Sequence, residues 1–478
     1  MDNTRNILKY GGLIWMLLAF AACVPTVTQK TANRNVPGLY SNGPLDTLNT
    51  ARVSWKEFFT DPYLHALIDT ALRNNQELNI IMREISIAQN DVRARKGEYL
   101  PFVDLFAGAG VEKVARYTRD GSVEANSEIE PGKEFPDPLP DFMLAANFSW
   151  QVDIWKKLRN AKQAALLRYL ATTEGRNFTV TRLVAEIADS YYELMALDNQ
   201  LDILRKNIEI QTNALEIVKM EKTAARVTEL AVRRFEAEVL KNQSRIFHVQ
   251  QEIVFAENRI NFLVGRFPQH IERNSLEWAE LTPKLMQEGI PSQLLQNRPD
   301  IRQAELALAA AHLDVKSAKA NFYPTFNITS TLGLQAFNAT YLFSKPESMM
   351  YNAIGGLGQP LVNRNAIKAM YMNANARQVQ AAYNYERTIL NAYIEVTNQI
   401  ANISNMKSSY DLRVQQVLAL TQSIDISTRL FRSARADYME VLLTQRDALE
   451  SKFELVETKK QQMIAMVNVY QALGGGWN

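Results

Sequence analysis

The amino-acid sequence predicts a mainly α-helical chain that also contributes a small set of β-strands to a membrane barrel. Three observations lead to this fold class. Residues 141–264 contain no Pro and one Gly, and residues 361–473 contain neither, so two very long helical blocks are expected. Four other segments alternate apolar and polar side chains, as transmembrane barrel strands do. The sequence also begins with an export signal.

The overall composition resembles that of an ordinary globular protein. The chain of 478 residues is 47% hydrophobic and 22% charged, with a mean hydropathy of −0.22. After the export signal, no stretch reaches the roughly 18 apolar residues of a transmembrane helix, so a membrane protein built from a helical bundle is not expected. The formal net charge of +2 gives no signal for a nucleic-acid partner, and none is expected.

The first 22 residues are predicted to be a signal peptide. Two basic residues precede the apolar run Leu13–Ala22, which is too short to span a bilayer. The run ends in Phe20-Ala21-Ala22-Cys23, which resembles a bacterial lipobox with Phe20 in the place of the usual Leu. Cys23, the single cysteine of the sequence, is therefore the predicted lipidation site. The alternative is a plain signal peptide followed by an incidental cysteine.

The first half of the mature chain is expected to follow an extended equatorial segment at residues 23–60. This half, residues 61–265, is expected to hold a helix that begins at Asp61-Pro62 and ends near Glu98, strands at 101–113 and 142–153, and a long helical hairpin at 155–265. The connection between the two strands, 116–140, is rich in polar and turn residues and is expected to be a loop.

The second half is expected to repeat the first after a connecting equatorial segment at 266–289. It comprises residues 290–473, with a helix, strands at 324–335 and 348–359, and a long helical hairpin at 364–473. An offset of 223 residues places Leu72 on Leu295, Asn74 on Asn297 and Pro101 on Pro324, which indicates a duplication. Residues 474–478 are expected to be a flexible, glycine-rich C-terminal tail.

The four strand segments could belong to a soluble antiparallel sheet or to a membrane barrel. Alternation alone also fits half-buried strands of a soluble antiparallel sheet. The pairing of the strands into two hairpins, together with an export signal, favours a membrane barrel. Four strands cannot close a barrel, and an open edge is not tolerated in lipid. An oligomer of two, three or four chains would be needed, giving about 8, 12 or 16 strands.

Four motifs stand out along the chain. They are Ser149-Trp150-Gln151-Val152-Asp153-Ile154-Trp155 with Arg159-Asn160, then Asn297-Arg298-Pro299-Asp300-Ile301-Arg302-Gln303-Ala304-Glu305, then Phe322-Tyr323-Pro324, and finally Gln359-Pro360-Leu361. Together with the order of the elements and the duplication, these motifs resemble the TolC/OprM/NodT family of outer-membrane efflux channels, especially its lipoprotein branch. The resemblance covers nearly the whole mature chain. It implies a TolC-like channel in the outer membrane of a Gram-negative bacterium, lipid-anchored at Cys23 and extending into the periplasm.

The resemblance also implies partners and an activity. Three chains would form a homotrimer in which a 12-stranded barrel, in contact with outer-membrane lipid, continues into a long α-helical periplasmic barrel. The function implied is that of a passive exit duct of a tripartite efflux pump that exports small molecules such as drugs and toxic compounds. The partners implied are a periplasmic adaptor (membrane fusion) protein and an inner-membrane transporter of the RND type.

Two helical-hairpin tips are expected near Thr223–Glu229 and Arg432–Glu440, and the resemblance places them at the periplasmic end. The tip residues implied to contact the adaptor are Ala225, Arg226, Ala434 and Arg435, with Ala225 and Ala434 in the place of the family's usual Gly. The resemblance further implies a periplasmic gate at Asp437 and Glu440, although Leu443 replaces the second acid of the family's motif. The alternative is that both carboxylates are solvated residues of a helix surface.

No enzymatic motif is found in the sequence. A P-loop is lacking, and the four histidines show no metal-ligand spacing, so no cofactor, no metal and no enzymatic activity are expected. Two other functions stay open at this point. One is the outer-membrane channel of a type I protein secretion system. The other is a periplasmic coiled-coil scaffold or adaptor without a pore.

Overall fold

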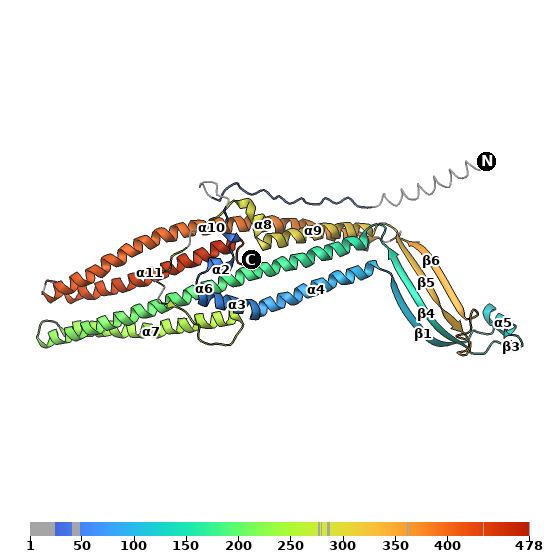
Figure 1. Ribbon diagram of the computed structural model, residues 1–478, viewed down its shortest axis with the longest axis horizontal. Helices are drawn as coiled ribbons and strands as arrows, with labels where there is room; N and C mark the ends of the chain where they lie inside the picture. The colour runs from blue at the N-terminus through green and yellow to red at the C-terminus, as the bar shows by residue number, and fades with distance from the viewer. Residues whose placement is uncertain are drawn as a thin grey trace. The chain divides into compact units, whose positions relative to one another are not determined.

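The computed structural model describes residues 24–40, 48–275, 278, 280–283, 287–360, 362, 364–433 and 435–477. The chain forms two compact units. The first unit holds the described residues up to 31 together with 86–169 and 306–382. The second unit holds the described residues of 32–85, 170–305 and 383–477. Figure 1 shows both units and labels most of their helices and strands.

The first unit contains a four-stranded antiparallel sheet. Its strands are β1 (Phe102–Glu112), β4 (Leu139–Val152), β5 (Thr325–Ala336) and β6 (Met349–Gly358), in the spatial order β1-β4-β5-β6. Each half of the chain supplies one hairpin, and the two hairpins join through β4 and β5. The expectation of four strands per chain is confirmed.

The connection from β1 to β4 differs from the expected loop. It holds a short helix, α5 (Arg119–Ala125), and a small hairpin of β2 (Glu128–Glu130) and β3 (Lys133–Glu134). The hydroxyl of Thr118 caps α5 by accepting a hydrogen bond from the N–H of Gly121 at 3.2 Å. Hydrogen bonds at the cap and turns therefore give secondary structure to a segment whose composition suggested only a loop.

The N-terminal helical region differs from expectation at one residue. After η1 (Thr50–Arg52) and α2 (Trp55–Phe58), the expected single helix divides into α3 (Pro62–Asn74) and α4 (Gln76–Tyr99). Asn75 causes the division. Its side-chain oxygen caps α4 by accepting from the N–H of Leu78 at 3.0 Å, and its amide donates to the carbonyl of Leu263 at 2.8 Å. The buried side chain of Asn75 thus interrupts the helix and at the same time links it to the end of α7.

The two long helical blocks each form a hairpin. The first consists of α6 (Lys157–Thr223) and α7 (Glu229–Val264), and the second of α10 (Asn365–Arg432) and α11 (Tyr438–Ala472). Between the blocks lie η3 (Pro291–Gln293), α8 (Leu294–Asn297) and α9 (Pro299–Ala320). At 1.5 Å per residue, α6 and α10 are each about 100 Å long. Within the described ranges, no helix combines the length and apolar character needed to cross a bilayer.

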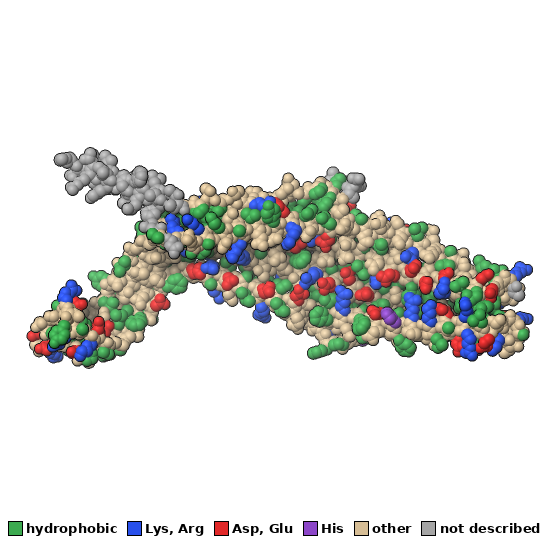
Figure 2. Space-filling view, turned by 180° about the vertical axis from the view of Figure 1, so that it is seen from behind, with side chains coloured by type: hydrophobic (Ala, Val, Ile, Leu, Met, Phe, Trp, Pro, Cys, Tyr) green, Lys and Arg blue, Asp and Glu red, His purple; other side chains and the backbone are tan. Residues whose placement is uncertain are grey.

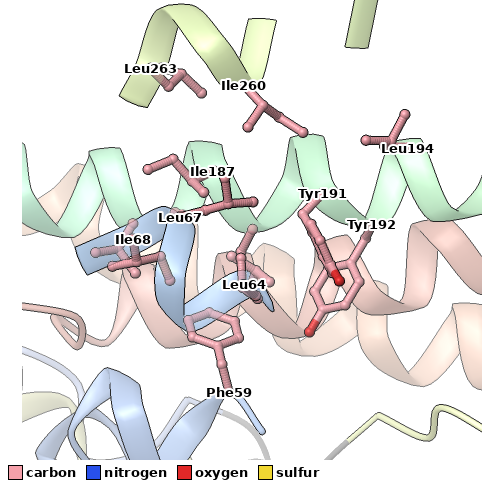
Figure 3. Packing of buried hydrophobic residues seen from close by; sticks show 14 of the residues in the cluster. Phe59, Leu64, Leu67, Ile68, Ile187, Tyr191, Tyr192, Leu194, Ile260 and Leu263 are labelled. Atoms are coloured by element: carbon pink, nitrogen blue, oxygen red, sulfur yellow. The ribbon is translucent and has the colours of Figure 1, made fainter. Parts of the chain in front are cut away.

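The core of the second unit forms where α3, α6 and α7 meet (Figure 3). Leu64, Ile187 and Ile260 are fully enclosed there. The hydroxyl of Tyr191 donates to the carboxylate of Asp61 at 2.7 Å, so the residue that caps α3 is also held by α6. One side chain therefore fixes both the start of a helix and its position in the core.

Arg298 holds the start of α9 in the second unit. The guanidinium is buried and donates to Asp300 at 2.7 Å, to Glu395 at 2.7 Å and to the carbonyl of Ala472 at 2.8 Å. Ion-pair partners raise the pKa of Arg298 although burial opposes the rise. The motif that contains Arg298 thus ties the first turn of α9 to α10 and to the end of α11.

The expectation of a flexible C-terminal tail is wrong. Gly474 has φ of +93°, and a Cβ at this position would lie 2.7 Å from the carbonyl oxygen of Asn297. The N–H of Gly475 donates to the carbonyl of Tyr470 at 2.9 Å, and the indole of Trp477 donates to the carbonyl of Gly474 at 2.9 Å. The glycines allow a close backbone approach, so the segment packs against the unit rather than extending into solvent.

Candidate functional site

The four-stranded sheet has two chemically different faces. Because the strands are in register, side chains that alternate along one strand meet their counterparts on the next strand. One face is apolar across all four strands; a typical row across it is Leu105, Ala146, Leu332 and Tyr351. The alternation seen in the sequence is therefore a continuous surface in the structure.

The apolar face is not covered by other parts of the described chain. Leu105 is 84% exposed and Tyr351 is 82% exposed. Burying a large apolar side chain is worth about 1.5–3 kcal/mol, so a whole face of such residues is expected to be covered in the functional state. In Figure 2, the visible surface of the sheet is mostly free of charged side chains, which gather along the helices and at the far end of the sheet.

The opposite face of the sheet carries most of the polar side chains of the strands, beside exposed Phe102, Phe106 and Ile354, and it is hydrogen-bonded across the strands. The hydroxyl of Thr331 donates to Asn147 at 2.9 Å, and the backbone N–H of Thr331 donates to Asn352 at 3.0 Å. Farther along, the amide of Gln335 donates to Asp141 at 2.9 Å. Rows of exposed amides and hydroxyls suit contact with water, as on the inner face of a membrane barrel.

Both edges of the sheet lack a strand partner within the described chain. In the order β1-β4-β5-β6, the strands β1 and β6 each pair on one side only. A row of unpaired backbone N–H and C=O groups is unfavourable in lipid, where no water can satisfy it. Within the described chain, the sheet is therefore open at both edges.

Aromatic side chains lie at the helical end of the sheet. The indole of Trp150 donates to the carbonyl of Tyr99 at 3.2 Å. The indole of Trp155 donates to the carbonyl of Pro324 at 2.8 Å, and its ring stacks on Tyr323 with 4.8 Å between the centroids. Half-exposed Trp side chains at strand ends are typical of the interface between a membrane and water.

The turn of the first hairpin, between α6 and α7, contains a strained residue. Ala225 adopts φ of +54°, in the left-handed region, and its N–H donates to the carbonyl of Lys222 at 2.9 Å. The N–H of Arg226 donates to the carbonyl of Glu221 at 2.9 Å, which completes the C-terminal cap of α6. Lys222 and Glu229 form an ion pair across the turn, which lowers the pKa of Glu229. Alanine thus takes the conformation for which glycine is usual.

The turn of the second hairpin, between α10 and α11, carries the two predicted gate carboxylates. Asp437 is the N-cap residue of α11, and Glu440 lies in the first turn of the helix. The side chain of Asp437 makes no capping hydrogen bond, and both carboxylates are exposed. Of the predicted tip residues, Ala225, Arg226 and Arg435 lie in exposed turns, whereas Ala434 and the predicted lipidation site Cys23 lie outside the described residues.

The two hairpin turns lie at the same end of the second unit (Figure 1). Tyr438 and Leu442 of α11 pack against a buried cluster of α6 and α7 that includes Val218 and Phe235. This packing brings the two predicted tips to one surface, although more than 200 residues separate them in the sequence.

Within the described ranges, no group of three or more His, Cys, Asp or Glu side chains is placed to hold a metal ion.

Comparison with known proteins identifies this architecture. The sequence profile described as outer membrane efflux protein matches residues 67–266 and 290–475, which is most of the chain. The chain belongs to the outer membrane efflux protein family. The sequence-based identification of the family and the outer-membrane location are confirmed, and the two-faced sheet is the part of this efflux protein that fits a membrane.

Individual relatives agree with the family assignment over nearly the full length. The cation efflux system protein CusC of Escherichia coli is 25% identical over 464 residues, which cover 96% of this chain and 97% of CusC. The pyoverdine export outer membrane protein OpmQ of Pseudomonas aeruginosa is 27% identical over 428 residues, covering 88% and 87% of the two chains. A membrane protein of Pseudomonas aeruginosa of known structure superposes with a TM-score of 0.84 at 22% identity, over 94% of this chain and 99% of the other. The predicted TolC-like fold is confirmed.

Proposed function

We propose that the efflux protein acts as a homotrimeric, passive exit duct across the outer membrane. The observation that carries the proposal is the sheet, which has an exposed apolar face, a polar opposite face and two unpaired edges. If β1 of each chain pairs with β6 of the next, three chains close a barrel of 12 strands. The apolar face then meets lipid, and the polar face lines a water-filled pore.

Cysteine cross-linking tests the trimer directly. Leu105→Cys in β1 is combined in turn with Tyr351→Cys, Ala353→Cys and Gly355→Cys in β6, and the outer-membrane fraction is oxidised and separated by size. At least one pair is expected to give a covalent trimer, because facing edge residues lie close together. Chains with only one of the two substitutions serve as controls. A cross-linked dimer with no larger species would contradict the 12-stranded barrel.

The proposed partners are a periplasmic adaptor protein and an inner-membrane transporter of the RND type, and the proposed cargo is small molecules. Two of the relatives are named for the efflux of cations and the export of pyoverdine, which supports a small cargo. The test is deletion of this chain, followed by a panel of drugs, detergents, solvents and metal ions. Increased sensitivity to at least one compound is expected. Unchanged tolerance together with the loss of a secreted protein would instead support the type I secretion channel.

The two hairpin turns are proposed to form the periplasmic end of the duct. Exposed Ala225, Arg226 and Arg435, with Ala434, are proposed to contact the adaptor. Asp437 and Glu440 are proposed to narrow the closed channel, which is supported by their exposure and by the absence of a capping role for the Asp437 side chain. Three copies would gather like charges near the axis of the channel. Unchanged single-channel conductance of an Asp437→Asn/Glu440→Gln variant would rule out this gate.

Two further features of the chain are proposals. Lipidation at Cys23 is proposed from the lipobox-like sequence, and the mass of the mature N-terminal peptide, with Cys23→Ser as its control, tests it. The division into two repeats, 61–265 and 290–473, is supported by the same order of helix, two strands and helical hairpin in each half. The two segments matched by the family profile lie close to these halves.

A further inference from the structure

Charge is distributed unevenly within the first unit. The parts of α4, α6, α9 and α10 that belong to it (86–99, 157–169, 306–320 and 365–382) carry eleven Lys or Arg and only three acids, Asp91, Glu98 and Asp314. The four strands of the large sheet show the opposite balance, with Asp104, Glu112 and Asp141 and no Lys or Arg. The sign of the charge therefore changes between the sheet and the helices next to it.

Three of these basic residues line one cavity of about 420 Å³. They are Arg95 of α4, Arg168 of α6 and Arg377 of α10, and the cavity contains one acid, Asp314 of α9. Arg168 forms an ion pair with Asp314. Burial raises the pKa of Asp314, and the charges of Arg168, Arg377 and Arg95 all oppose that rise. Arg95 in turn forms an ion pair with both carboxylate oxygens of Glu98 at 3.0 Å. Three guanidinium groups and these two carboxylates leave one excess positive charge at the cavity in each chain.

A neighbouring cavity shows which face of the helices carries the arginines. This second cavity, of about 600 Å³, shares Arg95, Ala161 and Ser317 with the first. It is also lined by Gln151 and Thr329, which point from the polar face of the sheet. The arginines therefore lie on the side of the first unit that continues the polar face, which is the side proposed to line the pore.

Another face of α9 and α10 is occupied by the N-terminal segment, residues 24–31. Gln29 contacts His312 of α9 at 3.1 Å, and the backbone of Lys30 exchanges hydrogen bonds with Gln378 of α10 at 3.0 and 2.8 Å. At 100° per residue, Lys316, Lys319 and Lys368 project on this side, away from the cavity with the three arginines. The helices α9 and α10 thus also carry three lysines on the side away from the cavity, equal in number to the three arginines that line it on α4, α6 and α10.

We propose that Arg95, Arg168 and Arg377 form an anion-binding subsite in the pore at the base of the barrel, which takes solutes that carry carboxylate, phosphate or sulfonate groups. The proposal rests on the proposed trimeric duct, which would repeat the subsite three times around the axis. The planar guanidinium group binds two oxygens of such an anion through paired hydrogen bonds. The Arg95 and Arg168 side chains are about half exposed, so a solute in the pore can reach them.

Planar-bilayer recording of the full-length channel tests the subsite. The wild type is compared with an Arg95→Gln/Arg168→Gln/Arg377→Gln variant in a KCl gradient, and pyrophosphate is added as an oxyanion probe. The chloride-to-potassium permeability ratio is expected to fall at least about threefold in the variant, because the fixed positive charge is lost. The pyrophosphate concentration for half block is expected to rise about tenfold, because the paired hydrogen bonds are lost.

The control is Lys316→Gln/Lys319→Gln/Lys368→Gln, which removes the same charge from the other side of the helices and is expected to behave like the wild type. Equal shifts in the two triple variants, or no shift in either, would overturn the subsite. If the arginine variant fails to reach the outer membrane, Arg377→Gln alone is measured, with a smaller shift in the same direction expected and no shift counting against the subsite. If neither the wild type nor the Asp437→Asn/Glu440→Gln variant conducts, the proposed duct is overturned, and the subsite with it.

Discussion

The sheet of the first unit and the core of the second unit use the same large apolar side chains in opposite ways. In the core, Leu64 is 0% exposed, because α3, α6 and α7 enclose it. In the sheet, Leu105 of β1 is among the most exposed apolar residues, because no described part of the chain covers that face. The chain itself encloses the core of the second unit, whereas no described part of the chain covers the apolar face of the sheet.

Polar groups in the two regions show the same contrast. In the second unit, buried Arg298 and Tyr191 are satisfied by partners from distant helices. On the sheet, Asn147, Thr331 and Asn352 bond mainly to one another and stay accessible on one face. The stability of the second unit therefore depends on hydrogen bonds and ion pairs between its own helices. The stability of the sheet depends on whether water or lipid contacts each of its faces.

The largest expected effect is the loss of the buried guanidinium in the second unit. Arg298→Ala leaves the carboxylates of Asp300 and Glu395 and the carbonyl of Ala472 without this donor. The free energy of unfolding should fall by about 3–5 kcal/mol, as for other broken buried ion pairs. Urea unfolding in detergent measures it. Arg446→Ala, which removes an exposed ion pair with Asp447 in α11, is the control and should cost less than about 1 kcal/mol.

The next effect tests the two faces of the sheet with neighbouring residues of β4. Leu144→Arg places a charge on the apolar face and should reduce insertion by about 2–4 kcal/mol per chain. Met143→Arg places the same charge on the polar face and should insert normally. The amount of each variant in the outer-membrane fraction is the measurement. Equal losses for both variants would contradict the assignment of the faces to lipid and water.

A smaller effect concerns a buried carboxyl group in α6. Burial raises the pKa of Asp189 to about 7, and one of its oxygens has no hydrogen-bond partner among the described residues. Between the ordinary pKa of 3.8 and about 7, the folded state keeps the proton of Asp189, whereas the unfolded state has released it. The contribution of this group to the free energy of unfolding is therefore fully present at low pH and is lost as the pH rises through about 7. Asp189→Asn should stabilise the protein by about 2 kcal/mol at pH 8 and by much less at pH 5. Urea unfolding at both pH values tests the sign, and a gain that does not depend on pH would refute it.

The smallest effect concerns the strained turn between α6 and α7. Ala225→Gly should raise the free energy of unfolding by about 1 kcal/mol, because glycine adopts the left-handed conformation without a steric penalty. Ala224→Gly, one residue earlier, should give no such gain. Thermal unfolding of the two variants compares them directly. A loss of stability in Ala225→Gly would mean that the alanine methyl group contributes more by packing than it costs by strain.

Much of the fold could be predicted from the sequence because its signals are local. The absence of Pro and Gly identifies the long helices, the period-2 pattern identifies the strands, and Asp61-Pro62 marks a helix start. The turns at Ala225 and Asp437 also fall where the sequence placed the hairpin tips. Periodicity and capping depend on neighbours only a few residues apart, so they can be read without a structure.

The contacts between residues that are far apart in the sequence could be seen only in the tertiary structure. Sequence reasoning missed the break at Asn75, which depends on a carbonyl of Leu263, and the packing of Gly474 against Asn297. It also gave no sign that Arg95, Arg168 and Arg377 share a cavity, because no motif links them. The sequence by itself determined the long helices, the four strands of the large sheet and the faces of those strands, since these follow from local periodicity. The pairing of β4 with β5 and the convergence of charges depend on how separate segments pack, so they needed the fold.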